Sequence, residues 1–235
     1  MAFAYKNHSV RMVLSAVFFG FLIGFLVITA KAQRTVDQTL AVITDDSGAS
    51  ELITLSDVRW QLALEPGAQI DDVRPDDVTR VLDLLIKQRL FSLEANRIPQ
   101  APPSDADISA EVRDILAQFS TPTEFESRLR KVGFSSVKDE NFERMMADRV
   151  RIKKYIDFRF RSFVVVTPEE ELKYFQEEFL PAFKKRFPGS PEPAFSAKRS
   201  QITQSLVERR VGESIEAFLD EAERSVEIIY LFDGN

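Results

Sequence analysis

The sequence predicts a mainly α-helical (α+β) fold in which a set of helices is closed by one small antiparallel sheet. Along most of residues 33–235, apolar side chains recur at three- and four-residue steps, the period of an amphipathic helix. Only the two ends of this part are β-prone: Leu40–Thr44 and Glu51–Leu55 flank a turn signal, and Val226–Phe232 lies near the C-terminus. A lone C-terminal strand needs a partner, so we expect it to pair with the N-terminal hairpin.

The first helices have recognisable start and stop signals. We expect Ser56 to cap a short helix that Pro66 stops. A longer helix is predicted from about Pro75 to Asn96, because one face carries an apolar stripe. The residues of this stripe are Val78, Val81, Leu82, Leu85, Ile86, Leu90 and Leu93.

Capping motifs open the next two helices. Ser104–Asp107 precedes a stripe that ends at Phe119, and Thr121–Glu124 is a capping box with proline at the first helical position. Gly133 supplies the stop of this second, short helix. Both helices are therefore expected to begin at the residue after the capping side chain.

Three further helices complete the predicted order. The longest is expected from about Ser136 to Phe163. Thr167–Glu170 forms another capping box, and Pro181 should kink the helix that follows or end it near Leu180. Residues 188–194 are proline- and glycine-rich and predict a linker, after which the last long helix begins at Ser196.

Residues 1–32 are predicted to be a signal peptide or an N-terminal membrane anchor. Basic residues precede the uncharged residues 12–30, and Ala30 and Ala32 supply the small residues of a signal-peptidase site. The uncharged stretch would span roughly 28 Å as a helix, close to the thickness of a bilayer core. Attachment to the inner membrane through residues 12–30 therefore stays open beside cleavage. Either outcome places residues 33–235 in the periplasm or another extracytoplasmic compartment.

Composition excludes much of enzyme chemistry from residues 33–235. The chain has no cysteine, and its single histidine, His8, lies in the predicted leader. Histidine- or cysteine-based nucleophile pairs, the usual zinc and haem ligands and structural disulfides are therefore absent from the body. The leader holds three of the 31 basic residues and no acid, so the body carries 28 basic against 37 acidic residues, a net charge of −9. We expect no cofactor, no metal site and no nucleic-acid partner.

Four stretches resemble a known family when they are taken in order. They are ELITLSDVRW (Glu51–Trp60), VLDLLIKQRLFSLEAN (Val81–Asn96), Phe142–Phe179 with RIKKYI and VVVTPEEELKYFQEEF, and Phe195–Ile229 with QITQSLVERRVGESIEAFLDEAERSVEI. This order is similar to the N-terminal core and C-terminal helix and strand of the SurA family of bacterial periplasmic chaperones. The resemblance implies a SurA-like chaperone core over residues 33–235.

The departure from the family pattern concerns its enzyme. Family members usually carry one or two parvulin-type prolyl isomerase domains at the place that residues 188–194 occupy here. This linker is too short for a domain, and the histidines characteristic of parvulin sites are absent from the body. The resemblance therefore implies a chaperone core that is not an enzyme.

A chaperone of this kind needs exposed, adaptable apolar side chains for unfolded clients. Several aromatic and methionine side chains fall off the apolar stripe of their helix or neighbour a residue that occupies it. The alternative is that these helices are buried on two sides, so that the same residues are core. The candidate client-binding residues are Met145, Met146, Tyr155, Phe158, Tyr174, Phe175, Phe179 and Phe183.

Two charged clusters have simpler interpretations than ligand sites. Asp71, Asp72, Asp76 and Asp77 lack calcium-loop spacing and are better explained as a solvated helix start. The basic residues between positions 149 and 161 are expected to pair with the acidic segments Asp139–Glu143 and Glu169–Glu171, or to line a polar wall of the client-binding surface. These basic residues are Arg149, Arg151, Lys153, Lys154, Arg159 and Arg161.

The predicted function is that of an ATP-independent chaperone for unfolded or nascent exported polypeptides, including envelope and outer-membrane proteins. An envelope scaffold that binds one folded partner is the first alternative. A homologue with residual prolyl isomerase activity is the second. A hydrolase built on paired carboxylates stays formally open, but no pair of acids is marked for that role.

Overall fold

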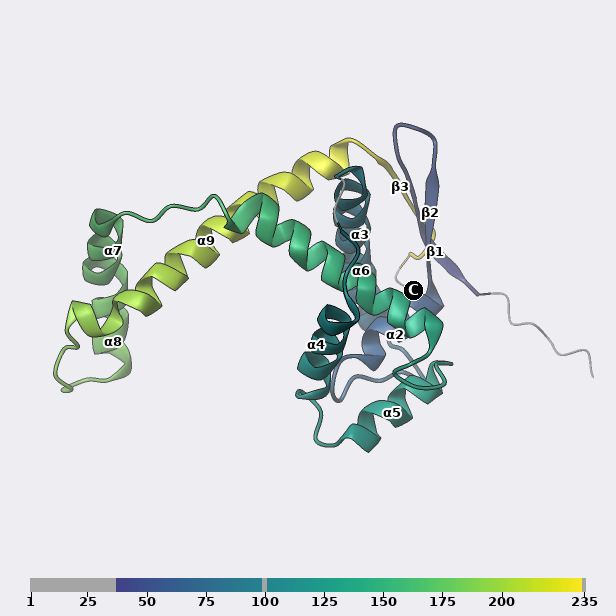
Figure 1. Cartoon of the computed structure of the whole chain (residues 1–235), viewed down its shortest axis with the longest axis horizontal. Helices are drawn as coiled ribbons and strands as arrows, with labels where there is room; N and C mark the ends of the chain where they lie inside the picture. Colours follow the sequence, from purple (N-terminus) through teal and green to yellow (C-terminus); the bar gives the residue numbers. More distant parts are fainter. Residues whose placement is uncertain (1–36, 99–100, 234–235) are drawn as a thin grey trace, which may run out of the picture. The chain divides into compact units, whose positions relative to one another are not determined.

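The computed structural model describes residues 37–98 and 101–233, and its fold is mainly helical with one three-stranded antiparallel sheet (Figure 1). The strands β1 (Thr39–Thr44), β2 (Ser50–Thr54) and β3 (Glu227–Tyr230) lie in the order β2-β1-β3. The C-terminal strand pairs with the N-terminal hairpin, so the predicted fold class is confirmed.

The predicted leader, its cleavage residues Ala30 and Ala32, and the membrane-attachment segment 12–30 lie outside the described residues. In the part of the chain that the structure describes, no helix combines the length and the apolar character that a membrane span requires.

The sheet buries one face against helices. Ala41 and Ile43 of β1 and Ile53 of β2 are buried in the core that α2 (Leu55–Ala63) and α3 (Pro75–Arg97) complete. The hairpin turn is held by Asp45, whose carboxylate accepts the backbone N–H groups of Ser47 and Ala49. Gly48 occupies the left-handed region at φ 82°, which a side chain would disfavour. Turn chemistry and alternating burial thus set the register of the hairpin.

The cap of α2 is Thr54, and the expectation that Ser56 caps this helix is wrong. Thr54 accepts the backbone N–H of Asp57, and the Asp57 carboxylate accepts the backbone N–H of Thr54 at 2.8 Å. The cause is the direct passage from strand to helix: Thr54 still has the extended backbone that a cap requires, whereas Ser56 is already helical.

The following helices begin where the capping signals predict. They are α4 (Asp105–Leu116), with Ser104 and Asp107 as a capping box, and α5 (Pro122–Lys131), capped by Thr121. These helices form a second core with α6 (Glu140–Ile156) around rings that meet edge to face. Its buried members are Leu64, Ile115, Phe119, Phe125, Leu129, Phe134, Phe142 and Met146.

Two helices contain π-helical turns. The long predicted helix starts at Glu140, capped by Asp139, and continues from α6 into η1 (Asp157–Arg161). The next runs through α7 (Pro168–Tyr174), η2 (Phe175–Phe179) and α8 (Leu180–Arg186), so it does not end near Leu180. In the wider turn the Leu180 N–H bonds to the Phe175 carbonyl, which gives Pro181 room without ending the helix.

The last helix, α9 (Phe195–Arg224), follows the loop of residues 188–194 and links two packed regions of the described chain (Figure 1). Near its C-terminal end, Phe218 stacks on Phe91 of α3 at 5.0 Å between ring centroids. Near its N-terminal end, Arg199 and Thr203 bond to Glu171 of α7. One helix therefore joins the sheet-bearing core to the helices α7 and α8.

The basic residues of α6 find different partners from those expected. Arg149 and Lys153 both pair with Glu111 of α4, and Lys154 pairs with Asp107. The expected pairing with the segments at 139–143 and 169–171 is wrong for these three side chains. The reason is that residues four apart share one helix face, and this face of α6 crosses α4.

Glu111 is the most buried anion of this contact, with 4% of its surface exposed. Burial opposes ionisation of Glu111, but the hydrogen bonds and charges of Lys153 and Arg149 outweigh it and hold the pKa below its usual value. A lowered folded-state pKa stabilises the fold above the unfolded value. This stabilisation is lost as the pH falls through the folded-state pKa.

Glu111→Gln is expected to lower the free energy of unfolding by about 1–2 kcal/mol at neutral pH, because it leaves two cations without their shared anion. The difference from the unmodified protein should shrink as the pH falls below the unfolded-state pKa of glutamate, and it should vanish below the lowered folded-state pKa of Glu111, where the folded carboxylate is protonated. Urea unfolding at several pH values measures both effects. Glu126→Gln is the matched control, because the exposed Glu126–Arg130 pair should contribute little. If Glu111→Gln lowered the free energy of unfolding as much at acidic pH as at neutral pH, the electrostatic explanation would be contradicted.

Candidate functional site

The candidate client-binding residues fall into three groups. Met146, Tyr155 and Phe175 are buried, so the expectation that they form an exposed surface is wrong. The ring of Tyr155 packs against the rings of Phe91, Phe160 and Phe218, with ring centroids 6.1–6.4 Å apart. For Met146 and Tyr155 the reason is that α6 is covered by α4 on one side and by α3 on another, so side chains off one apolar stripe enter a second core. The ring of Phe175 in η2 packs instead against those of Phe179 and Phe195.

Four candidates are partly buried: Met145, Tyr174, Phe179 and Phe183. Along η2 and α8 the ring centroids of Phe179 and Phe183 are 6.3 Å apart. Those of Phe183 and Phe187, the residue after α8, are 5.1 Å apart. These rings cover part of one another. Tyr174 is covered on one face by the guanidinium of Arg209, 5.1 Å from its ring centroid.

Phe158 is the remaining candidate, and it is 52% exposed. Phe163 and Val165 lie close to it in sequence and are exposed by 71% and 73%. The rings of Phe158 and Phe163 meet edge to face at 6.3 Å. We call these three residues the apolar strip.

Sequence reasoning missed two members of the apolar strip. The sequence predicts only that the long helix ends near Phe163, and neither Phe163 nor Val165 is among the predicted client-binding residues. The helical turns end at Arg161, so Phe163 lies beyond the part of the helix that packs. The signal that could have found it is the change from helical period to the β-branched run Val164–Val166, which places the preceding residues at a helix end.

Arginines hold the segment that carries the strip against α9. Arg161 donates two hydrogen bonds to Glu208, at 2.6 and 3.0 Å. Arg210 donates to the Val165 carbonyl and pairs with Glu170, which caps α7. The hydrogen bond from Arg161 holds the pKa of Glu208 below its usual value, so this pair stays charged at neutral pH. The Arg161 guanidinium and the Val165 carbonyl thus have hydrogen-bond partners, while the side chains of Phe158, Phe163 and Val165 stay exposed to solvent.

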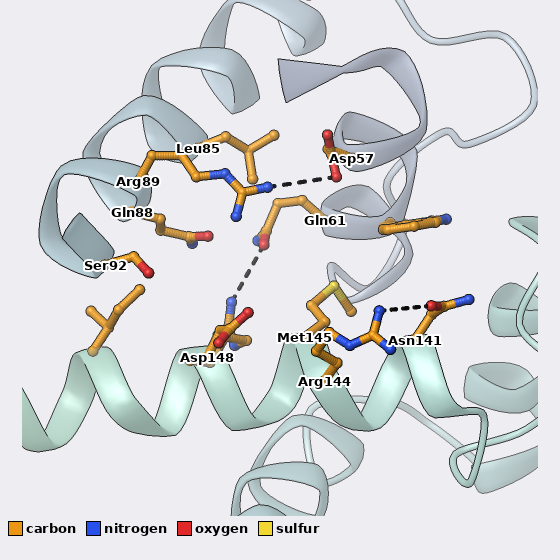
Figure 2. Close-up of a pocket in the computed structure, with 13 residues that line it drawn as sticks. Asp57, Gln61, Leu85, Gln88, Arg89, Ser92, Asn141, Arg144, Met145 and Asp148 are labelled. Atoms are coloured by element: carbon orange, nitrogen blue, oxygen red, sulfur yellow. Dashed lines mark hydrogen bonds and ion pairs between the residues drawn. The ribbon is translucent and has the colours of Figure 1, made fainter. Parts of the chain in front are cut away.

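A pocket of about 240 Å³ lies between α2, α3 and α6 (Figure 2). Arg149 of α6 reaches across it and donates to the Gln61 amide oxygen at 3.3 Å. Arg89 of α3 points toward α2, with Nη2 3.9 Å from Asp57 Oδ1. The wall is apolar at Trp60, Leu85, Met145 and Ile152 and polar at Asp57, Gln61, Gln88, Arg89, Ser92, Asn141, Arg144, Asp148 and Arg149.

This mixture of groups suits non-covalent contact with a polypeptide. The apolar wall can take one large side chain, and the amide and guanidinium groups can donate hydrogen bonds to backbone carbonyls. Met145 is the one predicted client-binding residue that lines the pocket. The pocket and the apolar strip are thus two surfaces of different polarity.

The acidic cluster at the start of α3 is engaged in ion pairs. Asp77 bonds to Arg74 at 2.9 Å, and Asp71 pairs with Lys131 of α5. Over residues 37–98 and 101–233, no three acidic or histidine side chains are grouped so that they could hold a metal ion.

No protein-family model matches the chain, and a search of curated proteins finds no match.

Truncation of the buried Tyr155 in α6 and of the exposed Phe158 in η1 should have effects on stability of very different size. Tyr155→Ala should lower the free energy of unfolding by about 3–5 kcal/mol, because it removes a ring from a packed aromatic cluster. Phe158→Ala should change it by less than about 0.5 kcal/mol, because the ring is half exposed. Thermal or urea unfolding of the two variants measures this difference. An equal loss of unfolding free energy in the two variants would contradict the burial of Tyr155 and the exposure of Phe158.

Proposed function

We propose that the protein is an extracytoplasmic, ATP-independent chaperone that binds unfolded or extended segments of exported polypeptides. The observation that carries this proposal is the apolar strip: the rings of Phe158 and Phe163 meet, Val165 follows closely in sequence, and all three side chains are more than half exposed on a segment held by ion pairs. Exposed apolar surface of this kind is typical of interaction sites. The sequence resemblance to the SurA chaperone core and the predicted leader support the client class and the compartment.

The mechanism that we propose is reversible capture without covalent chemistry. Burying a large apolar side chain is worth about 1.5–3 kcal/mol. A strip of three such residues therefore offers several kcal/mol, which the ordering of an unfolded client largely offsets. Binding of this strength is weak and reversible, and it depends on apolar area rather than on one client sequence.

The strip supports a client-binding role better than an enzymatic one. Its three members carry no titratable group, and Arg161 and Arg210 beside it are engaged in ion pairs with Glu208 and Glu170. The scaffold alternative uses the same surface for one folded partner. It is distinguished from the chaperone proposal by the breadth of what is bound.

The double change Phe158→Ser with Phe163→Ser should raise the concentration of protein needed to suppress client aggregation by about fivefold or more, because it removes two of the three apolar contacts. Light scattering of a diluted, unfolded outer-membrane protein measures this, with and without ATP. The thermal midpoint of the variant should stay near that of the unmodified protein.

Leu172→Ser is the matched control for this experiment. Leu172 is an exposed apolar residue of α7 outside the strip, so its replacement should leave suppression unchanged. Unchanged protection by the double variant would overturn the proposal. Recovery of one stoichiometric folded partner from an envelope extract, with no binding of unfolded clients, would favour the scaffold.

A further inference from the structure

The third surface of interest is the open edge of the sheet. In the order β2-β1-β3, the strand β3 has β1 as its only strand neighbour among the described residues. Edge strands are usually protected by charged side chains, above all lysine, by proline, by a very short length or by a covering segment. The stretch 226–232, VEIIYLF, contains neither lysine nor proline; its one charged residue is Glu227, at the start of the four-residue strand, and Tyr230 is 61% exposed. No described strand pairs with this edge, so it can serve as a template for another strand.

The direction of the backbone groups follows from the pairing with β1. Leu231 donates its N–H to the carbonyl of Leu40 at 2.8 Å, so its peptide groups point toward β1. Successive residues of a strand alternate in this direction. Ile229 therefore also points toward β1, and the N–H and C=O groups of Ile228 and Tyr230 point toward the open edge.

Side chains on the outer face of the sheet add an apolar component. Val42 pairs with Leu52 on one side and with Ile229 on the other, so these three side chains form one row across the sheet. Leu52 and Ile229 are exposed by 53% and 45%. A strand added beside β3 would extend this row if it presents an apolar side chain opposite Ile229.

We propose that the β3 edge binds a strand-forming segment of an unfolded client by strand addition. The occupant must have backbone groups that match Ile228 and Tyr230, and apolar residues at alternate positions to continue the row. This inference rests on the proposed chaperone function and names the client class: segments that become β-strands in their native proteins.

The size of the edge favours a client over a second copy of this chain. The ladder has four residues, Glu227–Tyr230, whereas a stable specific interface buries about 1,200–2,000 Å². Four residues on each side supply far less than that area. A short edge instead gives the weak, rapidly reversible pairing that a holding chaperone requires.

The experiment uses the full chain and a fluorescent nine-residue peptide of alternating valine and threonine, with lysines at its ends. Binding is measured by fluorescence anisotropy, and the amide exchange of Ile228 and Tyr230 by NMR. We expect the peptide to slow exchange at both amides. We expect the same peptide with N-methyl groups on all of its valine and threonine residues to bind at least about tenfold more weakly, because neither of its edges can then donate hydrogen bonds to β3.

Tyr230→Pro tests the protein side of the pairing. Proline removes the outward N–H and blocks the edge, while Ile229 keeps its bonds to β1, so peptide binding should weaken by about tenfold or more. Tyr230→Thr is the matched control, because it keeps the N–H and the strand propensity and should bind the peptide nearly as well as the unmodified protein. If the proline variant does not fold, the N-methylated peptide carries the test alone.

Three outcomes would overturn the inference. They are equal binding of the N-methylated peptide, exchange protection confined to residues outside β3, and a concentration-dependent dimer in sedimentation that Tyr230→Pro abolishes. The last would assign the edge to a second copy. The Phe158→Ser, Phe163→Ser variant should still bind the peptide, so a failure of the strip proposal and a failure of the edge proposal give different results.

Discussion

The stacking of Phe218 on Phe91 is the contact on which the rest of the arrangement depends. It joins α9 to α3, and the same ring of Phe218 lies 5.6 Å from Phe160 of η1 and 6.2 Å from Tyr155 of α6. Three helices that are distant in sequence therefore share one aromatic cluster. Because aromatic rings bury large areas and meet in defined geometries, this cluster fixes the direction in which α9 leaves the core.

The course of α9 decides where the candidate surface lies. Beyond the aromatic cluster, α9 offers charged side chains to both neighbouring segments: Glu208 to Arg161, and Arg210 to Glu170. The segment between η1 and α7 is therefore tied at both ends, and its polar groups are engaged. A surface fixed in this way loses little conformational entropy when it binds, so most of the ordering cost falls on the client.

The fold could be predicted from the sequence further than the site could. Pairing of the two chain ends follows from the strand patterns alone, because a single terminal strand has no other partner. The start of α4 follows from Ser104 and Asp107, whose capping geometry is local. The cap at Thr54 was missed because strand and helix meet without a loop, so the extended residue that serves as cap also belongs to the strand.

The exposure of individual aromatic residues depends on contacts that no local pattern contains. Tyr155 and Phe158 are three residues apart and look alike in a helical projection, but one enters the cluster around Phe91 and the other does not. The difference is made by Phe218, which is 60 or more positions away in sequence. Helical period identifies the residues that can be buried, whereas the packing of distant elements determines which of them are.

The negative net charge of the chain bears on both proposed surfaces, because it opposes contact between two copies of the protein. Both the apolar strip and the β3 edge expose groups that would favour contact between copies of the chain, which is a liability for any protein. The chain carries a net charge of −6, and like charge opposes such contact while it does not oppose the approach of a neutral or basic client segment. The strip selects apolar side chains and the edge selects extended backbone. An apolar segment that has not yet folded into its native strand has both properties, so it can bind to the apolar strip and to the β3 edge.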